Sequence, residues 1–307
     1  MKIILLFVLL FACNHQLNAQ NSPLAVIPFE LKSDSRIYIK CRINNSDTLT
    51  FLFDTGAGAM VINKDIIGKK LNLDFDSEVN NQGANGENKV KKSNVNMFSF
   101  GGIKLEKISF LAIPYGNAAF DGVFGFNLMM KYIIDINYRK KLMFFYDPKN
   151  YLYQTDSYDK FDLKFGLGVP TIKASLVMGP RKVTGEFELD SGGDSGLILA
   201  RHFTNVNRIA SQFKQVAQAS IMGSDGVVTT TPIVVVPEIL LKNKRFYRLP
   251  ALLSASASGL LANSKLAGIF GNLYLKRFDM ILDFGHQKIY LKSNDLLHMP
   301  YYDFLIK

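Results

Sequence analysis

The sequence predicts an all-β protein built from two related β lobes, and three observations support this. Helical periodicity is scarce, and short alternating or continuous apolar runs dominate the 307 residues. Turn-forming pairs such as Asn85-Gly86 and Asp225-Gly226 separate these runs. Two short segments are near-copies of each other, which indicates that the second half of the chain repeats the first.

Nine segments have the length and composition of β-strands, and two others could each hold a short helix. The predicted strands are 36–43, 48–53, 107–113, 132–136, 141–146, 183–189, 227–236, 280–284 and 288–292. The two helical candidates are 64–70 and 205–217.

The repeated segment reads FLFDTGA at 51–57 and FELDSGG at 187–193, 136 positions later. In each copy a strand-like run stops at an aspartate, Asp54 or Asp190, and a hydroxyl residue and a glycine follow. The glycine permits a tight turn. Two carboxylates on matching loops are what acid–base hydrolysis with a shared proton requires. Asp54 and Asp190 are therefore the candidate catalytic residues.

The similarity extends well beyond these two segments. A hairpin-type turn follows the first aspartate after 29 residues and the second after 33. The turn residues are Gly83, Ala84, Asn85 and Gly86 in the first copy, and Gly223, Ser224, Asp225 and Gly226 in the second. Farther on, GVFGFNL at 122–128 matches GIFGNL at 268–273. The polar stretch 147–159 falls between the copies, so we expect one lobe at 20–150 and the other at 151–307.

The N-terminus reads as a secretion signal at 1–19. Lys2 supplies a positive charge, residues 3–12 are apolar, and LNA at 17–19 precedes a plausible cut after Ala19. Ten apolar residues are too few to span a bilayer, and no later stretch approaches the roughly 20 that are needed. We therefore expect an exported protein, periplasmic or secreted, without a transmembrane helix. An alternative stays open: LFAC at 10–13 loosely resembles a lipoprotein signal, which would anchor Cys13 at the outer membrane.

Composition limits the other classes of function. After cleavage Cys41 is the single cysteine, so stability must come from the core rather than from a disulfide. The formal net charge is +10, but the basic residues are scattered in small groups beside turn signals. Solvated strand ends or weak attraction to an acidic surface explain them, and no nucleic-acid motif is present. Three histidines without paired spacing and one cysteine do not make a zinc site, and no cofactor is expected.

These motifs resemble the aspartic protease clan of retropepsin-like and pepsin-like enzymes, in particular the bacterial retropepsin-like proteins. The resemblance rests on DTGA at 54–57, DSGG at 190–193, the two hairpins and the apolar-Gly elements at 123–125 and 269–271. It covers nearly the whole mature chain. It implies a bilobal fold of two β-barrel-like lobes with the active site between them, in which each apolar-Gly element passes behind the catalytic loop of its own lobe.

The residues after each aspartate are expected to support the pair. The hydroxyls of Thr55 and Ser191 are placed to hydrogen-bond across to the opposing loop, and Gly56 and Gly192 let backbone N–H groups approach the carboxylates. The two hairpins could close over an extended substrate as flaps and exclude water. The first hairpin has no evident tyrosine, which favours the glycine-rich, retropepsin-like kind.

The next position in each loop departs from many acid-optimum relatives. Ala57 and Gly193 lack the hydroxyl that would donate a hydrogen bond to the ionised carboxylate. The loss of that bond should raise the apparent pKa values of the pair. We therefore expect activity at mildly acidic to near-neutral pH.

The sequence thus predicts an exported aspartic endopeptidase that hydrolyses peptide bonds with a water activated between two aspartates. The rival hypothesis is a catalytically inactive relative that binds peptide or glycan in the same cleft. GDSG at 193–196 also resembles a serine-protease nucleophile loop, but in that order a histidine precedes the serine, and the mature chain has none before Ser195. Both aspartates lie in one chain, so a monomer suffices for the site. The substrate stays open.

Overall fold

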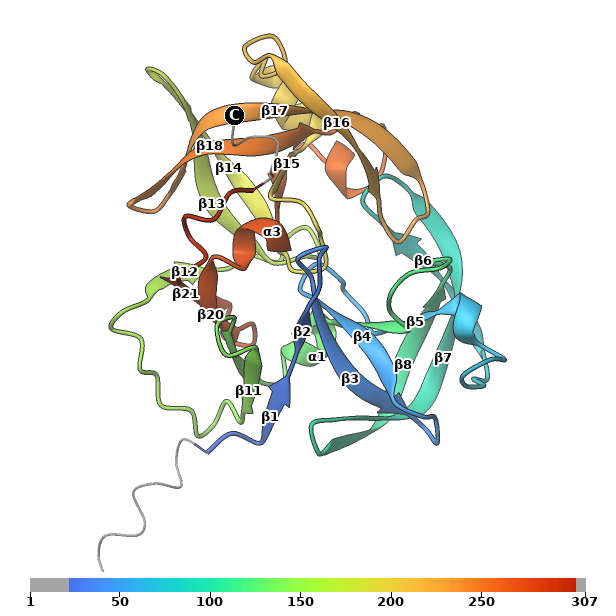
Figure 1. The fold of residues 1–307 in the computed structure, drawn as a ribbon. Coiled ribbons are helices and arrows are strands. Elements are labelled where there is room, and N and C mark those ends of the chain that lie inside the picture. Colours follow the sequence, from blue (N-terminus) through green and yellow to red (C-terminus); the bar gives the residue numbers. More distant parts are fainter. Residues whose placement is uncertain (1–21, 302–307) are drawn as a thin grey trace, which may run out of the picture.

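The computed structural model describes residues 22–301, which form three β-sheets (Figure 1). The predicted signal segment, the cut after Ala19 and Cys13 lie outside the described residues. No helix within residues 22–301 is long and apolar enough to cross a membrane.

The first half of the chain forms a closed barrel of six strands. Their order around the barrel is β3-β4-β9-β5-β8-β7, and pairing of β3 with β7 closes the ring. These strands are β3 (Ile37–Ile43), β4 (Leu49–Asp54), β5 (Val61–Asn63), β7 (Glu87–Phe100), β8 (Ile103–Ile113) and β9 (Gly122–Gly125). The short β2 (Glu30–Leu31) and the hairpin strand β6 (Ser77–Gln82) extend the sheet at its two ends.

The second half forms a barrel of the same kind. Its order is β13-β14-β19-β15-β18-β17, closed by pairing of β13 with β17, and β16 extends it as a hairpin strand. The strands are β13 (Thr171–Met178), β14 (Arg181–Asp190), β15 (Leu197–Leu199), β16 (Gln215–Met222), β17 (Val228–Leu241), β18 (Lys244–Leu253) and β19 (Leu266–Gly271). Strand for strand, this is the order found in the first barrel.

A six-stranded sheet joins the two barrels along one side of the molecule (Figure 1). Its order is β1-β11-β10-β20-β21-β12, and β10 pairs with β20 across the two halves of the chain. The strands are β1 (Ala25–Pro28), β10 (Ile133–Asn137), β11 (Leu142–Tyr146), β12 (Asp159–Asp162), β20 (Phe278–Asp283) and β21 (Lys288–Ser293). One-turn helices, α1 (Phe126–Met129) and α3 (Asn272–Leu275), lead from each barrel into this sheet.

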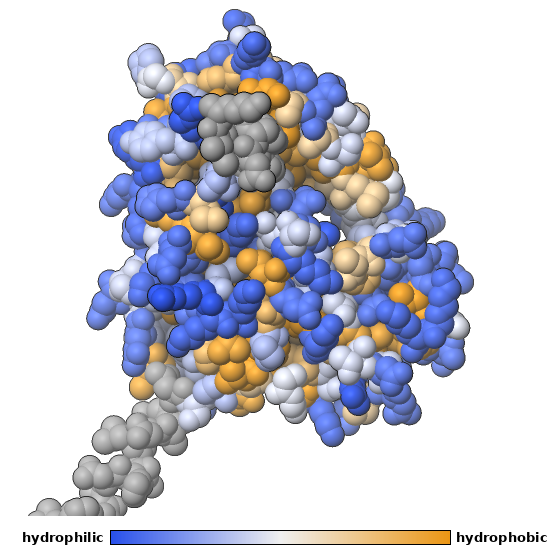
Figure 2. Space-filling view, viewed as in Figure 1, coloured by the Kyte–Doolittle hydropathy of each residue, from blue (hydrophilic) through white to orange (hydrophobic). Residues whose placement is uncertain are grey.

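Aromatic side chains fill the core behind both aspartates. Phe53 stacks on Phe124 with ring centroids 5.7 Å apart, and Phe187 stacks on Phe270 at 4.9 Å. All four rings are buried. Such offset pairs add to the stability that burial alone gives. The surface is mostly hydrophilic, with apolar residues scattered over the face drawn in Figure 2.

The structure confirms the all-β class and contains a strand at each of the nine predicted positions. The helix expected at 205–217 is wrong. The helix there is α2 (Arg201–Val206), and the end of the predicted segment belongs to β16, whose register with β17 overrides the local helical preference. The segment 64–70 holds only a 3₁₀ turn, η1 (Lys64–Ile66), capped by Asn63.

Candidate active site

Asp54 and Asp190 are the last residues of β4 and β14, and each strand pairs in parallel with a glycine-ended strand. Asp54 lies beside Gly125 of β9, and Asp190 beside Gly271 of β19. A Cβ on Gly125 would stand 2.2 Å from the carbonyl oxygen of Ala59. A Cβ on Gly271 would stand 2.3 Å from the carbonyl oxygen of Ser195, so both positions require glycine. The apolar-Gly elements therefore lie behind the aspartate loops, as expected.

Two hydroxyl residues join the loops to each other. The Thr55 hydroxyl donates to the carbonyl oxygen of Leu189 at 2.6 Å, and the Ser191 hydroxyl donates to that of Phe53 at 2.7 Å. The Thr55 hydroxyl oxygen also accepts the Ser191 N–H at 2.9 Å, and the Ser191 hydroxyl oxygen accepts the Thr55 N–H at 3.1 Å. Both side chains are buried. This reciprocal arrangement fixes the two aspartates relative to each other.

Backbone N–H groups point at both carboxyls. Gly56 and Ala57 donate to Oδ1 of Asp54 at 2.8 and 3.0 Å. Gly192 and Gly193 donate to Oδ1 of Asp190, each at 2.9 Å. Ala57 and Gly193 donate only through these N–H groups, because neither has a hydroxyl.

The two carboxyls contact each other directly through a hydrogen bond. The glycines of the opposite loops leave the room for this contact. A Cβ on Gly192 would stand 2.2 Å from Cγ of Asp54, and one on Gly56 would stand 3.0 Å from Cγ of Asp190. A side chain at either position would push the carboxyls apart.

The proton that the pair shares belongs preferentially to Asp190. Burial raises the pKa of Asp190 well above its usual value, and the neighbouring charge of Asp54 raises it further. Burial also raises the pKa of Asp54, but the hydrogen bond from Asp190, the two loop N–H groups and the charge of Arg36 oppose the rise. Loop N–H groups oppose the rise at Asp190 as well, so the charge of Arg36 is what makes Asp54 the more readily ionised member of the pair.

Arg36 comes from the loop before β3 and connects the first lobe to the second aspartate loop. Its guanidinium donates to the carbonyl oxygen of Gly192 at 3.4 Å and pairs with Asp34 at 3.0 Å. The positive charge therefore lies close to the catalytic pair while Asp34 keeps it in place.

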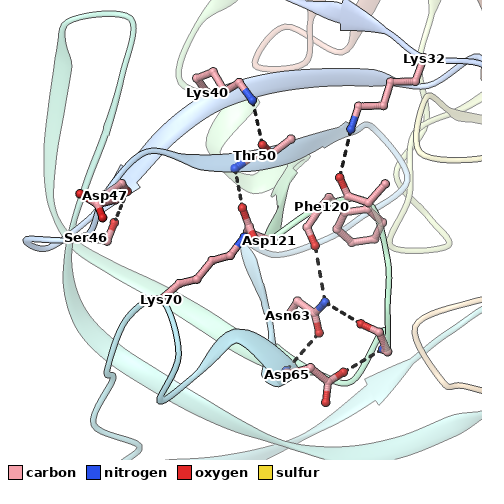
Figure 3. A network of polar contacts seen from close by, with 12 residues as sticks. Lys32, Lys40, Ser46, Asp47, Thr50, Asn63, Asp65, Lys70, Phe120 and Asp121 are labelled. Carbon is pink, nitrogen blue, oxygen red and sulfur yellow. Dashed lines mark hydrogen bonds and ion pairs between the residues drawn. The ribbon is translucent and has the colours of Figure 1, made fainter.

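A polar network holds the loop 114–121 against the strand that ends at Asp54 (Figure 3). The buried Asp121 accepts the Thr50 N–H at 2.9 Å and also pairs with Lys70. Asn63 donates to the carbonyl oxygens of Gly116 and Phe120 at 3.3 and 3.5 Å.

The same loop carries Tyr115, whose ring packs edge-on against Phe120. Burial raises the pKa of Tyr115, and the charges of Asp54 and Asp190 raise it further, so its hydroxyl lies within electrostatic range of both. Sequence reasoning missed Tyr115 because it lies 61 positions after Asp54 and outside every repeated motif.

The two predicted hairpin tips meet each other across the two lobes. The turn of the first hairpin closes with a bond from Gly83 N to Gly86 O, and that of the second with a bond from Gly226 N to Gly223 O. Asn85 joins them: its N–H donates to Asp225 Oδ2 at 2.9 Å, and its side-chain amide donates to the carbonyl oxygens of Ile221 and Val227, both at 2.9 Å. Contact between Asn81 and Ser224 adds to this junction.

The first hairpin also rests on a segment of the second half, 254–262. Leu260 N and Leu261 N of η2 (Leu260–Ala262) donate to the carbonyl oxygens of Gly83 and Ala84, each at 3.0 Å. Ser258 donates to the Asn85 carbonyl at 2.9 Å, and Ser256 donates to its side chain. All eight predicted flap residues thus lie in one closed, cross-lobe junction.

A third carboxyl belongs to the site and was missed. Glu188 is buried on β14 next to Gly56, and one of its oxygens has no hydrogen-bond partner. The signal was present in the sequence: an acid interrupts an apolar strand two residues before Asp190 and therefore shares its face.

The rival constellations do not assemble within residues 22–301. Ser195 is buried with a hydroxyl that lacks a hydrogen-bond partner, whereas His202, His286 and His298 are exposed. His286 pairs with Asp283 instead. No group of three or more His, Cys, Asp or Glu side chains in the described part of the chain is arranged to hold a metal ion.

Comparison with known proteins agrees with the geometry. Residues 39–128 match the family model described as aspartyl protease. Among solved structures, the aspartic proteinase from Irpex lacteus superposes with a TM-score of 0.59 at 10% identity, over 90% of this chain and 99% of that one. No curated protein sequence matches the chain. The chain is thus related in sequence, over residues 39–128, to the aspartyl protease family, and it has the two-lobed, all-β fold of the aspartic proteinases.

Proposed function

We propose that this protein is an exported aspartic endopeptidase. The observation that carries the proposal is the contact between Asp54 and Asp190, on two loops locked together by Thr55 and Ser191. Two carboxyls in contact cannot both ionise cheaply, so they hold one proton between them. That is the protonation state needed to attack an amide with water.

The chemistry follows from the shared proton. The ionised Asp54 takes a proton from a water held between the carboxyls, while the oxygen of that water bonds to the scissile carbonyl carbon. The protonated Asp190 gives its proton to the carbonyl oxygen, which yields a neutral gem-diol. On collapse, Asp54 gives its proton to the leaving nitrogen and Asp190 recovers one from the diol. The peptide bond is broken and both carboxyls return to their starting state.

The two hairpins are proposed to act as flaps over an extended peptide. Their tips meet across the lobes, so a substrate must separate Asn85 from Asp225 before it reaches the aspartates. Strand edges next to the site could then pair with the peptide backbone. Closure would exclude water from the reacting groups.

Two features of the whole protein belong to this proposal. The identical strand order of the two barrels supports an internal duplication, with one aspartate contributed by each copy. The apolar N-terminal segment supports export by a signal peptide cut after Ala19, and lipidation of Cys13 is the alternative route. Mass analysis of the mature N-terminus distinguishes the two.

The test of the activity is cleavage of casein and a peptide library at several pH values by wild type, Asp54→Asn and Asp190→Asn. We expect the wild type to cleave, pepstatin to inhibit, and each variant to lose almost all activity. Equal cleavage by all three proteins would refute the role of the two aspartates. A folded wild type that binds library peptides and cleaves none would establish the rival function, a peptide- or glycan-binding protein.

A further inference from the structure

Glu188 is a buried carboxyl that the proposed hydrolysis does not use. It lies two residues before Asp190 on β14, so its side chain is on the same face of the strand as the catalytic carboxyl. The residue is 3% exposed, and its Oε2 has no hydrogen-bond partner. Its Oε1 lies 2.7 Å from the point that a Cβ of Gly56 would occupy. The carboxyl therefore reaches across to the first aspartate loop, beside the place where a scissile bond must lie.

The matching position of the first lobe is apolar. Leu52 lies two residues before Asp54 on β4, is also 3% exposed, and packs with Tyr38, Val61 and Val123. The two matching strand positions thus differ in chemistry. One holds a hydrocarbon side chain and the other an acid, although the strands around them follow the same order.

Burial raises the pKa of Glu188 well above its usual value, and the charges of Asp190 and Asp54 raise it further, so the free protein keeps this carboxyl protonated. Within residues 22–301 it forms no ion pair, and the nearest charged groups that act on it are the carboxyls of Asp190 and Asp54. Arg36 and Lys164 pair with other carboxylates, Asp34 and Glu186. A buried polar atom without a partner costs about 1 to 3 kcal/mol, so a ligand that supplies a donor there gains affinity.

We propose that Glu188 determines substrate specificity by binding a lysine or arginine side chain next to the scissile bond. This rests on the proposed peptidase function. The ammonium or guanidinium group would donate an N–H to Oε2, and its positive charge would favour the ionised form of Glu188, whose proton passes to solvent. Leu52 would favour an apolar side chain on the other side of the scissile bond. The preferred sequence is therefore one basic and one apolar residue flanking the cut.

The experiment compares peptides that differ only at the two residues flanking the cut: basic–apolar, apolar–basic and apolar–apolar. Wild type, Glu188→Gln and Glu188→Leu are assayed, because the first change keeps the shape and the second copies Leu52. We expect wild type to favour one basic–apolar order over apolar–apolar by about tenfold or more in kcat/KM, as for a buried charge pair. Both variants should lose this preference, and Glu188→Leu should favour the apolar–apolar peptide.

A binding arm separates this inference from the proposed activity. Dissociation constants for the same peptides are measured with Asp54→Asn, with and without Glu188→Leu. If wild type cleaves peptides but neither cleavage nor binding depends on Glu188, the inference is overturned and the peptidase function stands. If nothing is cleaved but the basic peptide binds more tightly only when Glu188 is present, the peptidase function fails and the recognition role holds.

Discussion

Thr55 and Ser191 lie 136 positions apart, yet each accepts the backbone N–H of the other through its hydroxyl oxygen. Each hydroxyl then donates to the strand that precedes the other loop. Four buried hydrogen bonds therefore join the two lobes directly beneath the aspartates. The position of one carboxyl relative to the other depends on this joint.

Removing one of these hydroxyls should be costly. Thr55→Val keeps the shape but leaves the Ser191 N–H and the Leu189 carbonyl without their partners. We expect a loss of about 2 to 4 kcal/mol in unfolding free energy, since each buried group left unpaired costs about 1 to 3 kcal/mol. Urea unfolding measures it.

Thr171→Val is the matched control, because Thr171 is equally buried but its hydroxyl makes only long hydrogen bonds, of 3.3 and 3.5 Å. It should lose about 1 kcal/mol or less. Equal losses of unfolding free energy in the two variants would mean that the hydrogen bonds between Thr55 and Ser191 contribute no more to stability than the weak bonds of Thr171.

The pH dependence of activity follows from the two raised pKa values. Activity requires one proton on the pair, so it should fall at low pH as Asp54 is protonated and at high pH as Asp190 loses its proton. Burial raises both pKa values from the usual 3.8, that of Asp190 more strongly. We expect a bell-shaped kcat/KM profile with its maximum at mildly acidic to near-neutral pH. A maximum below about pH 3.5, lower than an ordinary carboxyl pKa, would contradict the assignment.

The same shift should affect stability. Because the pKa of Asp190 is raised on folding, the folded protein binds more protons than the unfolded chain above about pH 4. The stability that Asp190 contributes is fully present below its pKa in the unfolded chain. It is lost as pH rises from that value through its pKa in the folded protein. Asp190→Asn removes this loss, so the variant should gain stability over wild type as pH rises from 4 to 7, by about 1.4 kcal/mol for each pKa unit by which folding raises the Asp190 pKa within that range.

Denaturant unfolding at pH 3 and pH 7 tests this. At pH 3 wild type and Asp190→Asn should differ little, because Asp190 is protonated in both states of the wild type. An advantage of the variant that is the same at both pH values would show that titration is not its cause.

The sequence was sufficient for the parts of the site that depend on local chemistry. Asp54 and Asp190 stand out because a strand, an acid, a hydroxyl and a glycine follow in fixed order, and Asn85-Gly86 and Asp225-Gly226 are strong hairpin signals. Pairing of these elements could be inferred because they recur in the same order.

The parts that were missed depend on contacts between distant segments. Nothing local shows that β10 pairs with β20, that Tyr115 approaches the aspartates, or that Asn85 reaches Asp225. The helix expected at 205–217 failed for the same reason, because the second hairpin supplies β16 with a partner strand. Glu188 is different, since its alternation with Asp190 was readable in the sequence.

The contact of the first hairpin with the segment 254–262 gives a prediction about how the two hairpin tips separate. Gly259 has φ +72°, and a Cβ there would lie 2.4 Å from Gly86 N and 2.8 Å from Gly83 O. Gly259→Ala should therefore push the hairpin tip away from 254–262 and weaken the junction with Asp225. We expect the amides of 83–86 and 223–226 to exchange hydrogen about tenfold faster, because the closed form loses its backbone contacts.

Gly68→Ala is the matched control, because Gly68 has φ +78° and no atom within 4 Å of its Cβ position. It also places a side chain at a positive φ, but without the clash. Hydrogen exchange at the hairpin tips should therefore stay at the wild-type rate in Gly68→Ala and rise only in Gly259→Ala. Equal exchange in both variants would mean that the tips are held by their contacts with each other, and that the segment 254–262 does not control when the site opens.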